Sequence, residues 1–141
     1  MNGQLPPVMD LVGVRYTRGG VSPATGFDCF TLMAYVRHHY FGRPTPVLGI
    51  PATPMPSPRA AAQAIFLTLG GKERVGSAWH NCEPIAGVAV AMGSWSFSRL
   101  HHCGVIVGNG VLHALEGAGV VWTDHNRLSD IYARVEYFEC A

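Results

Sequence analysis

The hydrophobic pattern divides the chain into a helical half and a half made of short β-prone segments. Residues 13–26 are rich in glycine and predict a loop with turns. Apolar residues then recur with helical spacing over 29–40, directly after Asp28, a residue type that caps helix starts. Because Gly42 follows this run, the pattern predicts a helix over 29–40.

Two segments in the middle of the chain have biased compositions. Prolines recur through 44–58, which argues against a helix or a central strand and predicts a loop that follows the surface. The alanine-rich segment 58–69 ends at two glycines and is predicted to form a second helix. Residues 79–84 are expected to form a turn.

The rest of the chain has the pattern of short strands separated by Gly, Asn or Ser. The predicted strands are residues 87–92, 101–108, 110–115, 119–124 and 134–140. Helices first and an antiparallel sheet afterwards predict an α+β fold. The length of 141 residues fits a single domain over 1–141.

The segment 108–110, Gly-Asn-Gly, is a tight-turn signal between two of the predicted strands. A hairpin that closes there is expected to pair Val107 with Val111 and Val105 with His113. Diagonal neighbours on one face of such a hairpin can touch. The pattern therefore brings His113 close to the residues at the start of the preceding strand.

Charge and hydropathy exclude some classes of function. The formal net charge is +1 and the ten basic residues are scattered, so there is no basic stripe to bind nucleic acid. The N-terminus has no positive cluster followed by an apolar run, so no signal peptide is expected. No apolar run reaches the ~18 residues of a membrane-spanning helix. We therefore expect synthesis in a cytoplasm and no membrane insertion.

Four cysteines are spread along the chain without a Cys-x-x-Cys pair. Since disulfide frameworks usually belong to secreted chains with more cysteine, we expect free thiols. Cys29 falls at the predicted helix start, where the helix dipole and unpaired N–H groups favour a thiolate and can hold an oxyanion. Cys29 is therefore a candidate nucleophile, with a buried structural thiol as the alternative.

Seven histidines compete for the role of general base. His38 and His39 lie at the far end of the predicted helix, about 14 Å from Cys29 at 1.5 Å per residue. His80 and His125 have turn-like sequence contexts and are expected to be solvated surface residues.

Three histidines remain, all in the predicted sheet. His101 and His102 point to opposite faces of a strand, so only one of them can face the nucleophile. His113 lies across the hairpin and is a candidate for the group that orients the base imidazole. Strand periodicity alone does not choose between His101 and His102.

Two stretches of sequence, taken together, resemble a known family. GVRYTRGG with GFDC, and HHCGVIVGNGVLHA further on, are similar to the NlpC/p60 family of papain-like cysteine peptidases of the cell wall. The resemblance covers roughly residues 8–125. It implies a papain-like NlpC/p60 fold, with N-terminal helices packed on a small antiparallel sheet. It also implies an enzyme, a cysteine peptidase that hydrolyses peptidoglycan stem peptides between D-glutamate and a diamino acid or at a neighbouring bond.

The resemblance assigns roles position by position. Cys29 matches the nucleophile, His102 the general base, and His113 the polar residue that orients this base. Asp28 matches a carboxylate that receives the free amine of the stem peptide. Tyr16 matches a hydroxyl that lines the substrate cleft near the oxyanion. No metal or other cofactor is implied.

The sequence departs from the family pattern at three places. Phe30 follows the nucleophile where relatives usually have serine, and residues 85–88 lack the acid of a common turn. Arg15 replaces a common proline before Tyr16. None of these changes removes a group with an assigned catalytic role, so they bear on the substrate pocket.

The loop GGVSPATGFDC looks most like that of small peptidases encoded with the tail proteins of tailed phages. This likeness implies a place in the phage virion, at the tail tip, after synthesis in the host cytoplasm without a signal peptide. Other tail-tip proteins are then expected partners, and peptidoglycan stem peptides the expected substrate.

Two other functions are compatible with parts of the sequence. One is a structural tail-tip assembly protein that keeps the peptidase fold with little or no activity. The other is a zinc site, whose possible ligands are Cys82, Cys103, His80, His101 and His102. Structural zinc sites usually have closely spaced Cys or His pairs, and this spacing is missing, so we expect no metal.

Overall fold

The computed structural model describes residues 5–45, 79–93 and 102–140. The helix predicted at 58–69 and nearly all of the proline-rich loop lie outside this part of the chain. The described elements, in chain order, are η1 (Val8–Leu11), β1 (Val21–Ser22), β2 (Gly26–Phe27), α1 (Cys29–Phe41), β3 (Trp79–Asn81), β4 (Ala89–Gly93), β5 (His102–Val107), β6 (Gly110–Leu115), β7 (Gly119–Asp124), α3 (His125–Ile131) and β8 (Arg134–Cys140).

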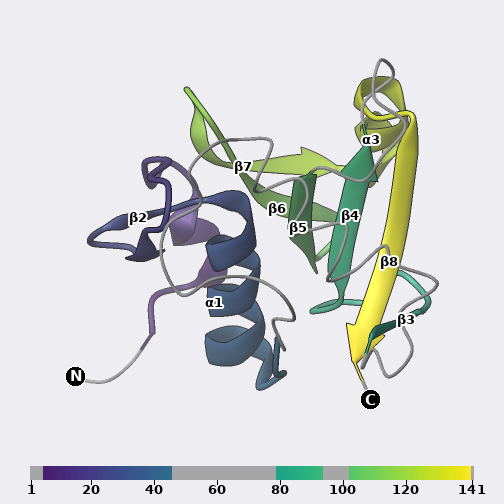
Figure 1. Ribbon diagram of the computed structural model, residues 1–141, viewed down its shortest axis with the longest axis horizontal. Helices are drawn as coiled ribbons and strands as arrows, with labels where there is room; N and C mark the ends of the chain where they lie inside the picture. The colour runs from purple at the N-terminus through teal and green to yellow at the C-terminus, as the bar shows by residue number, and fades with distance from the viewer. Residues whose placement is uncertain (1–4, 46–78, 94–101, 141) are drawn as a thin grey trace.

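The fold is α+β, as predicted, and its main feature is a six-stranded antiparallel sheet with the order β3-β8-β4-β5-β6-β7. Figure 1 shows α1 running beside this sheet, whereas α3 lies near the ends of β4 and β8. All five predicted strands are confirmed. No helix among the described residues is long and apolar enough to cross a membrane.

The prediction of a turn at 79–84 is wrong for its first residues. β3 pairs with β8, with Trp79 opposite Cys140. A three-residue edge strand is too short to show a period of two, and its partner lies some sixty residues further along the chain. Local sequence therefore carries little signal for it.

The hairpin register differs from the prediction by one residue. Val107 pairs with Gly110, so the turn has two residues and not three. Gly108 takes a positive φ of 60°, as tight two-residue turns require. Gly110 is already a strand residue, where a Cβ atom would come within 2.4 Å of the Thr123 carbonyl oxygen. Extending this register places His113 opposite Gly104, on the same side of the hairpin as His102.

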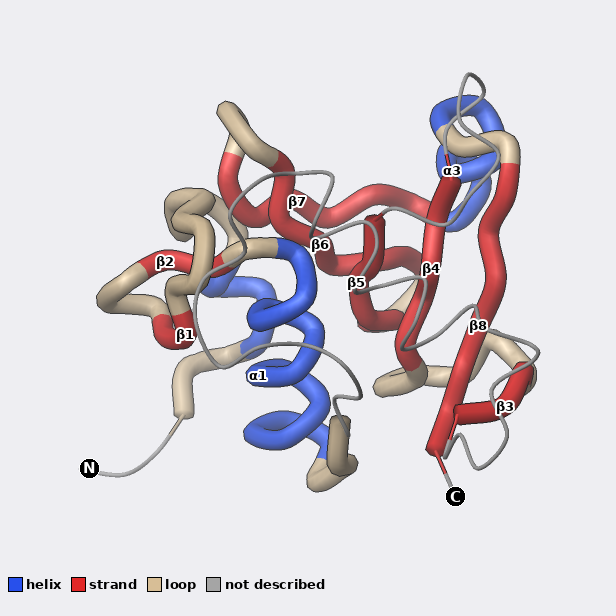
Figure 2. The backbone as a smooth tube through the Cα atoms, viewed as in Figure 1, coloured by secondary structure: helices blue, strands red, loops and turns tan. Residues whose placement is uncertain are grey.

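The helix predicted at 29–40 is confirmed as α1. Asp28 caps its start, and Thr31 completes a capping box by accepting the Asp28 backbone N–H. Gly42 ends the helix in the left-handed conformation. The glycine-rich stretch before it is mostly turns, but it also contains the small β1–β2 hairpin, which lies beside the N-terminal end of α1 (Figure 2).

Two groups of buried side chains hold the sheet and helices together. The α1 cluster joins the inner side of α1 to alternate positions of the strands, and its members are Leu11, Phe27, Cys29, Leu32, Met33, Val36, Ala89, Ala91, Cys103, Val105, Val107, Leu112, Ala114, Val120 and Phe138. The α3 cluster uses the other strand positions, and its members are Val88, Val90, Met92, Ile106, Val111, Leu128 and Tyr132. This alternation follows from the period-two geometry of strands.

Candidate active site

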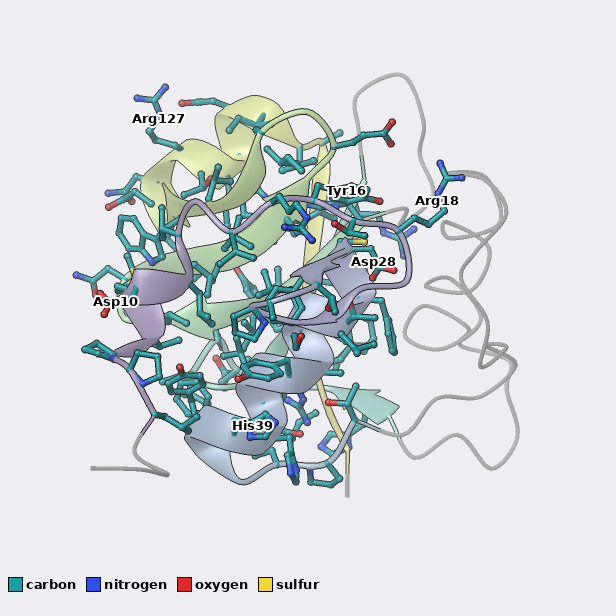
Figure 3. All side chains as sticks on the ribbon, turned by 90° about the vertical axis from the view of Figure 1, so that its left-hand side faces the viewer. Asp10, Tyr16, Arg18, Asp28, His39 and Arg127 are labelled. Atoms are coloured by element: carbon teal, nitrogen blue, oxygen red, sulfur yellow. The ribbon has the colours of Figure 1, made fainter. Side chains whose placement is uncertain are left out.

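Cys29 is the first residue of α1 and its side chain is buried, with 7 % of the residue exposed. Asp28 fixes this position from two directions. One carboxylate oxygen, Oδ1, accepts the Thr31 N–H at 2.8 Å, and the other accepts the Gly19 N–H at 3.0 Å. Figure 3 shows Tyr16 and Asp28 close together at this end of α1, with His39 at the opposite end. The glycine-rich loop is thereby fastened to the helix start that carries the thiol.

His102 and His113 are joined by a hydrogen bond between their rings. The His102 Nε2 and His113 Nδ1 atoms are 2.8 Å apart, and the His113 Nε2 atom is 2.8 Å from the Thr123 Oγ1 atom. Both imidazoles are buried. The ring of Tyr132 stacks on that of His102, with centroids 5.8 Å apart and planes 22° apart. Because Tyr132 belongs to the α3 cluster and Cys29 to the α1 cluster, the site lies between the two clusters.

The Cys29 thiol is hydrogen-bonded to the side chains of both Cys103 and His102. These contacts lower the pKa of Cys29 to about 5: the Cys103 hydrogen bond is the largest cause, and the hydrogen bond and charge of His102 add to it. Burial opposes them by penalising the charged form. At neutral pH Cys29 is therefore a thiolate, the form that attacks carbonyl groups.

Cys103 has the opposite tendency. Complete burial, together with the hydrogen bond and charge of Cys29, raises its pKa well above the usual value of a thiol. It therefore keeps its proton and donates S–H to the Cys29 sulfur. Sequence analysis did not assign this role to Cys103. The available signal was strand alternation, which turns Cys103 and His102 to opposite faces and so places Cys103 on the face that packs on α1.

His113 is held neutral. Burial, followed by the charge of His102, lowers its pKa to about 3. A neutral imidazole has one nitrogen that donates and one that accepts. His113 is thus able to receive a hydrogen bond from the Nε2–H group of His102, and it does not compete for the proton of the thiol.

Tyr16 and Asp28 lie next to these groups. Burial raises the pKa of the half-buried Tyr16 hydroxyl to about 12, with the charges of Cys29 and Asp28 as further causes, so the hydroxyl stays a donor. Both Asp28 carboxylate oxygens accept backbone N–H groups. In the structure, Asp28 caps the start of α1. Its contact with a substrate amine remains a prediction.

The remaining histidines lie away from this arrangement or outside the described residues. His38 and His39 are exposed in the last turn of α1, and His80 is exposed, as predicted, although it belongs to β3. The expectation for His125 is wrong, because it starts α3 and its Nε2 atom lies 2.8 Å from the Tyr137 hydroxyl. His101 is not among the described residues.

The prediction of free thiols is confirmed for three of the four cysteines. Cys29, Cys82 and Cys103 form no disulfide. The Cys140 side chain lies outside the description. Burial raises the pKa of the half-buried Cys82 thiol, so Cys29 is set apart from both other described cysteines. In the ranges 5–45, 79–93 and 102–140, no three His, Cys, Asp or Glu side chains gather as metal ligands would.

Comparisons with known proteins give structural matches. No protein-family model matches the sequence, and no curated protein does. The NlpC/p60 domain of the peptidoglycan hydrolase SagA superposes with a TM-score of 0.50 at 18 % identity, covering 95 % of this chain and 92 % of the other. A Staphylococcus aureus protein, described as similar to a lipoprotein of the NLP/P60 family, gives a TM-score of 0.52 at 20 % identity, covering 92 % of this chain and 38 % of the other. The fold is that of NlpC/p60 domains.

Within this NlpC/p60 fold, the described side chains form a set suited to acyl transfer. A thiolate lies at the N-terminus of α1, where backbone N–H groups and the positive end of the helix dipole favour negative charge. An imidazole is hydrogen-bonded to the sulfur, and a neutral imidazole is hydrogen-bonded to the first. Candidates for the nucleophile, the proton carrier and the orienting group are thereby in contact, as covalent catalysis on a carbonyl requires.

Proposed function

We propose that this protein is a cysteine endopeptidase that hydrolyses peptidoglycan stem peptides, with Cys29 as nucleophile, His102 as general base and His113 as the residue that orients His102. The observation that carries the proposal is the continuous contact from the Cys29 thiol through His102 to His113. The lowered pKa of Cys29, about 5, adds to it, since a structural buried thiol has a raised pKa, as Cys103 does.

The reaction begins with the Cys29 thiolate, whose sulfur forms a bond to the carbonyl carbon while the carbonyl π electrons move to oxygen. Backbone N–H groups of the first turn of α1 stabilise this oxyanion, and the Tyr16 hydroxyl is a further donor nearby. The C–N bond then breaks, and protonated His102 gives its proton to the leaving amine.

A thioester between Cys29 and the acyl part of the substrate remains. His102, now neutral, takes a proton from a water molecule, whose oxygen attacks the thioester carbon. Expulsion of the Cys29 thiolate releases the carboxylic acid product and regenerates the starting state. His113 keeps the Nε2–H side of His102 occupied, so that Nδ1 faces the sulfur in both halves of the reaction.

The substrate assignment has two supports. The motifs around Cys29 and His102 resemble those of NlpC/p60 cell-wall peptidases. One structural neighbour is itself named as a peptidoglycan hydrolase. The proposed scissile bond joins D-glutamate to a diamino acid or is a neighbour of that bond, with Asp28 receiving the free amine and Tyr16 lining the cleft.

We place the enzyme in the tail tip of a phage virion, in contact with other tail-tip proteins. This part rests on the likeness of residues 19–29 to small peptidases of phage tail operons. Mass spectrometry of purified virions, followed by antibody labelling of the tail under the electron microscope, tests it. A protein found only in the infected cell and never in virions would contradict this location.

The activity is tested by incubating the protein with purified muropeptides of several wall types and identifying the products by mass spectrometry. Wild-type protein is expected to release shortened stem peptides, and Cys29→Ala to release none. Cys82→Ala is the matched control, since it makes the same change at a half-buried thiol with a raised pKa. Absence of cleavage on every wall type would leave the structural tail-tip role as the better explanation.

A further inference from the structure

The hydrogen-bonded series does not end at His113. The His113 Nε2 atom lies 2.8 Å from Oγ1 of Thr123, on the neighbouring strand β7. Thr123 pairs with Val111 in the sheet, two residues before His113, so the strand pairing itself sets the hydroxyl against the imidazole. No role was assigned to Thr123 from the sequence.

The proton positions along the series follow from the donors and acceptors. His102 uses its Nε2 atom toward His113, which leaves Nδ1 for the Cys29 sulfur. A base that accepts a proton at Nδ1 must carry its other proton at Nε2 when it is neutral. The His113 Nδ1 atom must then be the acceptor, so His113 carries its single proton at Nε2 and donates it to Thr123.

The opposite tautomer of His113 would disable the base. With its proton at Nδ1, His113 would donate to His102, and neutral His102 would carry its proton on the side of the sulfur. In that state the lone pair of neutral His102 lies on Nε2, so His102 cannot take a proton from the water molecule that hydrolyses the thioester. The two tautomers of an isolated imidazole are both accessible, so something in the protein must choose between them.

We propose that Thr123 is a positioning residue that supplies the acceptor for the productive tautomer: its hydroxyl oxygen accepts the Nε2–H of His113, which leaves Nδ1 of His113 to accept from His102. The inference rests on the proposed function of His102 as base. His113 is only 1 % exposed, so water does not replace the hydroxyl as acceptor. A buried N–H group without an acceptor is unfavourable, which is why losing the hydroxyl disfavours the productive tautomer.

The other groups around His113 do not supply this acceptor. The ring of Tyr132 meets His113 edge-on, with centroids 6.4 Å apart, and the phenol pKa is raised by burial, so it stays protonated. Gly104, opposite His113, has no side chain; a Cβ atom there would come within 3.0 Å of the His113 Cβ. Among the hydrogen bonds described for the His113 ring, the Thr123 hydroxyl is thus the partner at Nε2.

The decisive measurement is the tautomer of His113 by ¹⁵N NMR of histidine-labelled protein in which Cys29 has been alkylated, so that no thiolate keeps His102 charged, in the wild type and in Thr123→Val. Valine keeps the branched shape and lacks the hydroxyl. We expect the Nε2–H tautomer in the wild type and a population shifted to Nδ1–H in Thr123→Val, with Thr123→Ser restoring the wild-type spectrum. A wild-type His113 protonated at Nδ1 would overturn the proposal without any variant, and so would unchanged tautomers in a folded Thr123→Val.

Activity gives the second readout. Thr123→Val should lower kcat/KM by about tenfold to a hundredfold, by analogy with the loss of an outer hydrogen-bond partner of a metal-bound imidazole. Thr123→Ser should recover most of it. Thr45→Val makes the same change beyond the C-terminal end of α1, where the hydroxyl accepts from Arg37, and should have no effect on either readout.

The two proposals fail in different ways. If wild-type protein cleaves no muropeptide while His113 shows the expected tautomer shift, the substrate assignment is wrong and the role of Thr123 stands. If cleavage occurs and Thr123→Val has wild-type kcat/KM, Thr123 is only a structural neighbour of the site.

Discussion

Both ends of α1 bury polar side chains, yet the two ends use different kinds of group. At the N-terminal end, Cys29 and His113 have pKa values displaced to about 5 and about 3. Towards the C-terminal end, Arg37 is fully buried and pairs with Glu139 of β8. The labels of Asp28 and His39 in Figure 3 mark the two ends.

Arg37 is satisfied by several fixed partners. Besides Glu139, it donates to the carbonyl oxygens of Gly87 and Pro44, each at 2.8 Å, and to the Thr45 hydroxyl at 3.0 Å. Arg43 also pairs with Glu139. A guanidinium keeps its charge at every accessible pH, so this group fastens α1 to β8 and has no proton to exchange.

The contrast separates structural polar groups from candidates for chemistry. Burial alone does not distinguish the two ends, since Arg37 and His113 are both almost fully buried. The displaced pKa values of Cys29 and His113 do distinguish them. Titratable groups whose pKa values are shifted by one another and by burial are typical of catalytic sites. Variants at the two ends should therefore affect different properties.

The largest expected effect is that of His102→Ala on activity. Loss of the proton carrier should lower kcat/KM by about 10²- to 10⁴-fold. The protein should stay folded, with a loss of about 1–3 kcal/mol in the free energy of unfolding, because the buried His113 Nδ1 atom loses its partner. His113→Asn should lower it less, because an amide oxygen still accepts from His102 Nε2. Muropeptide cleavage and urea unfolding measure the two properties. His38→Ala, an exposed position at the other end of α1, is the control, and equal, complete losses in His102→Ala and His113→Asn would mean that the roles are misassigned.

At the other end, Arg37→Met should act on stability and leave the thiol alone. Removing one partner of a buried ion pair leaves Glu139 without its main counter-charge, and we expect a loss of about 3–5 kcal/mol in urea unfolding. Arg43→Met should cost less, about 1 kcal/mol at most, since its side chain is 32 % exposed. Folded Arg37→Met should keep the wild-type alkylation rate of Cys29. A changed rate would show that the two ends are coupled through α1.

A smaller effect is expected from Cys103→Ala, which removes the hydrogen bond that contributes most to the low pKa of Cys29. A hydrogen bond to a charged group contributes about 1.5–3 kcal/mol, which raises the midpoint of Cys29 alkylation by about one to two pH units. The rate of reaction with iodoacetamide as a function of pH gives this midpoint, and Cys103→Ser should retain part of the effect. In the wild type, Cys29 should react faster than Cys82 and Cys103. An unchanged midpoint would leave His102 as the main cause of the low pKa.

The sequence predicted most of the architecture because the deciding signals are local. Asp28 before an apolar helical pattern and Gly42 after it define α1 at both ends. Gly108 and Asn109 predict the β5–β6 hairpin. The choice between a two-residue and a three-residue turn depended on Gly110, which is a strand residue that pairs with Val107 of β5 and Asp124 of β7. The register of this hairpin thus depends on its contacts with β7, and the prediction from local sequence was wrong by one residue.

The candidate site was only partly predictable for a similar reason. The position of Cys29 at a helix start can be read locally, and His102 was singled out by its motif. Cys103 and Thr123 act through partners on other elements, α1 and β6, which no local pattern links to them. Hydrogen bonds between elements distant in sequence become visible only when the sheet order is known.

The smallest effect, and the sharpest test of the comparison, concerns the pH dependence of stability. His113 has a pKa of about 3 in the folded protein, below its usual 6.5, so between pH 6.5 and 3 the unfolded chain binds the extra proton. The stability that neutral His113 contributes is therefore present above about pH 6.5 and is lost as the pH falls. His113→Asn removes this titration, and the decrease in unfolding free energy from pH 7 to pH 5 should become smaller by about 1–2 kcal/mol. His39→Asn makes the same change at an exposed site and should keep the wild-type decrease; parallel curves for wild type and His113→Asn would show that His113 is not held neutral by the fold.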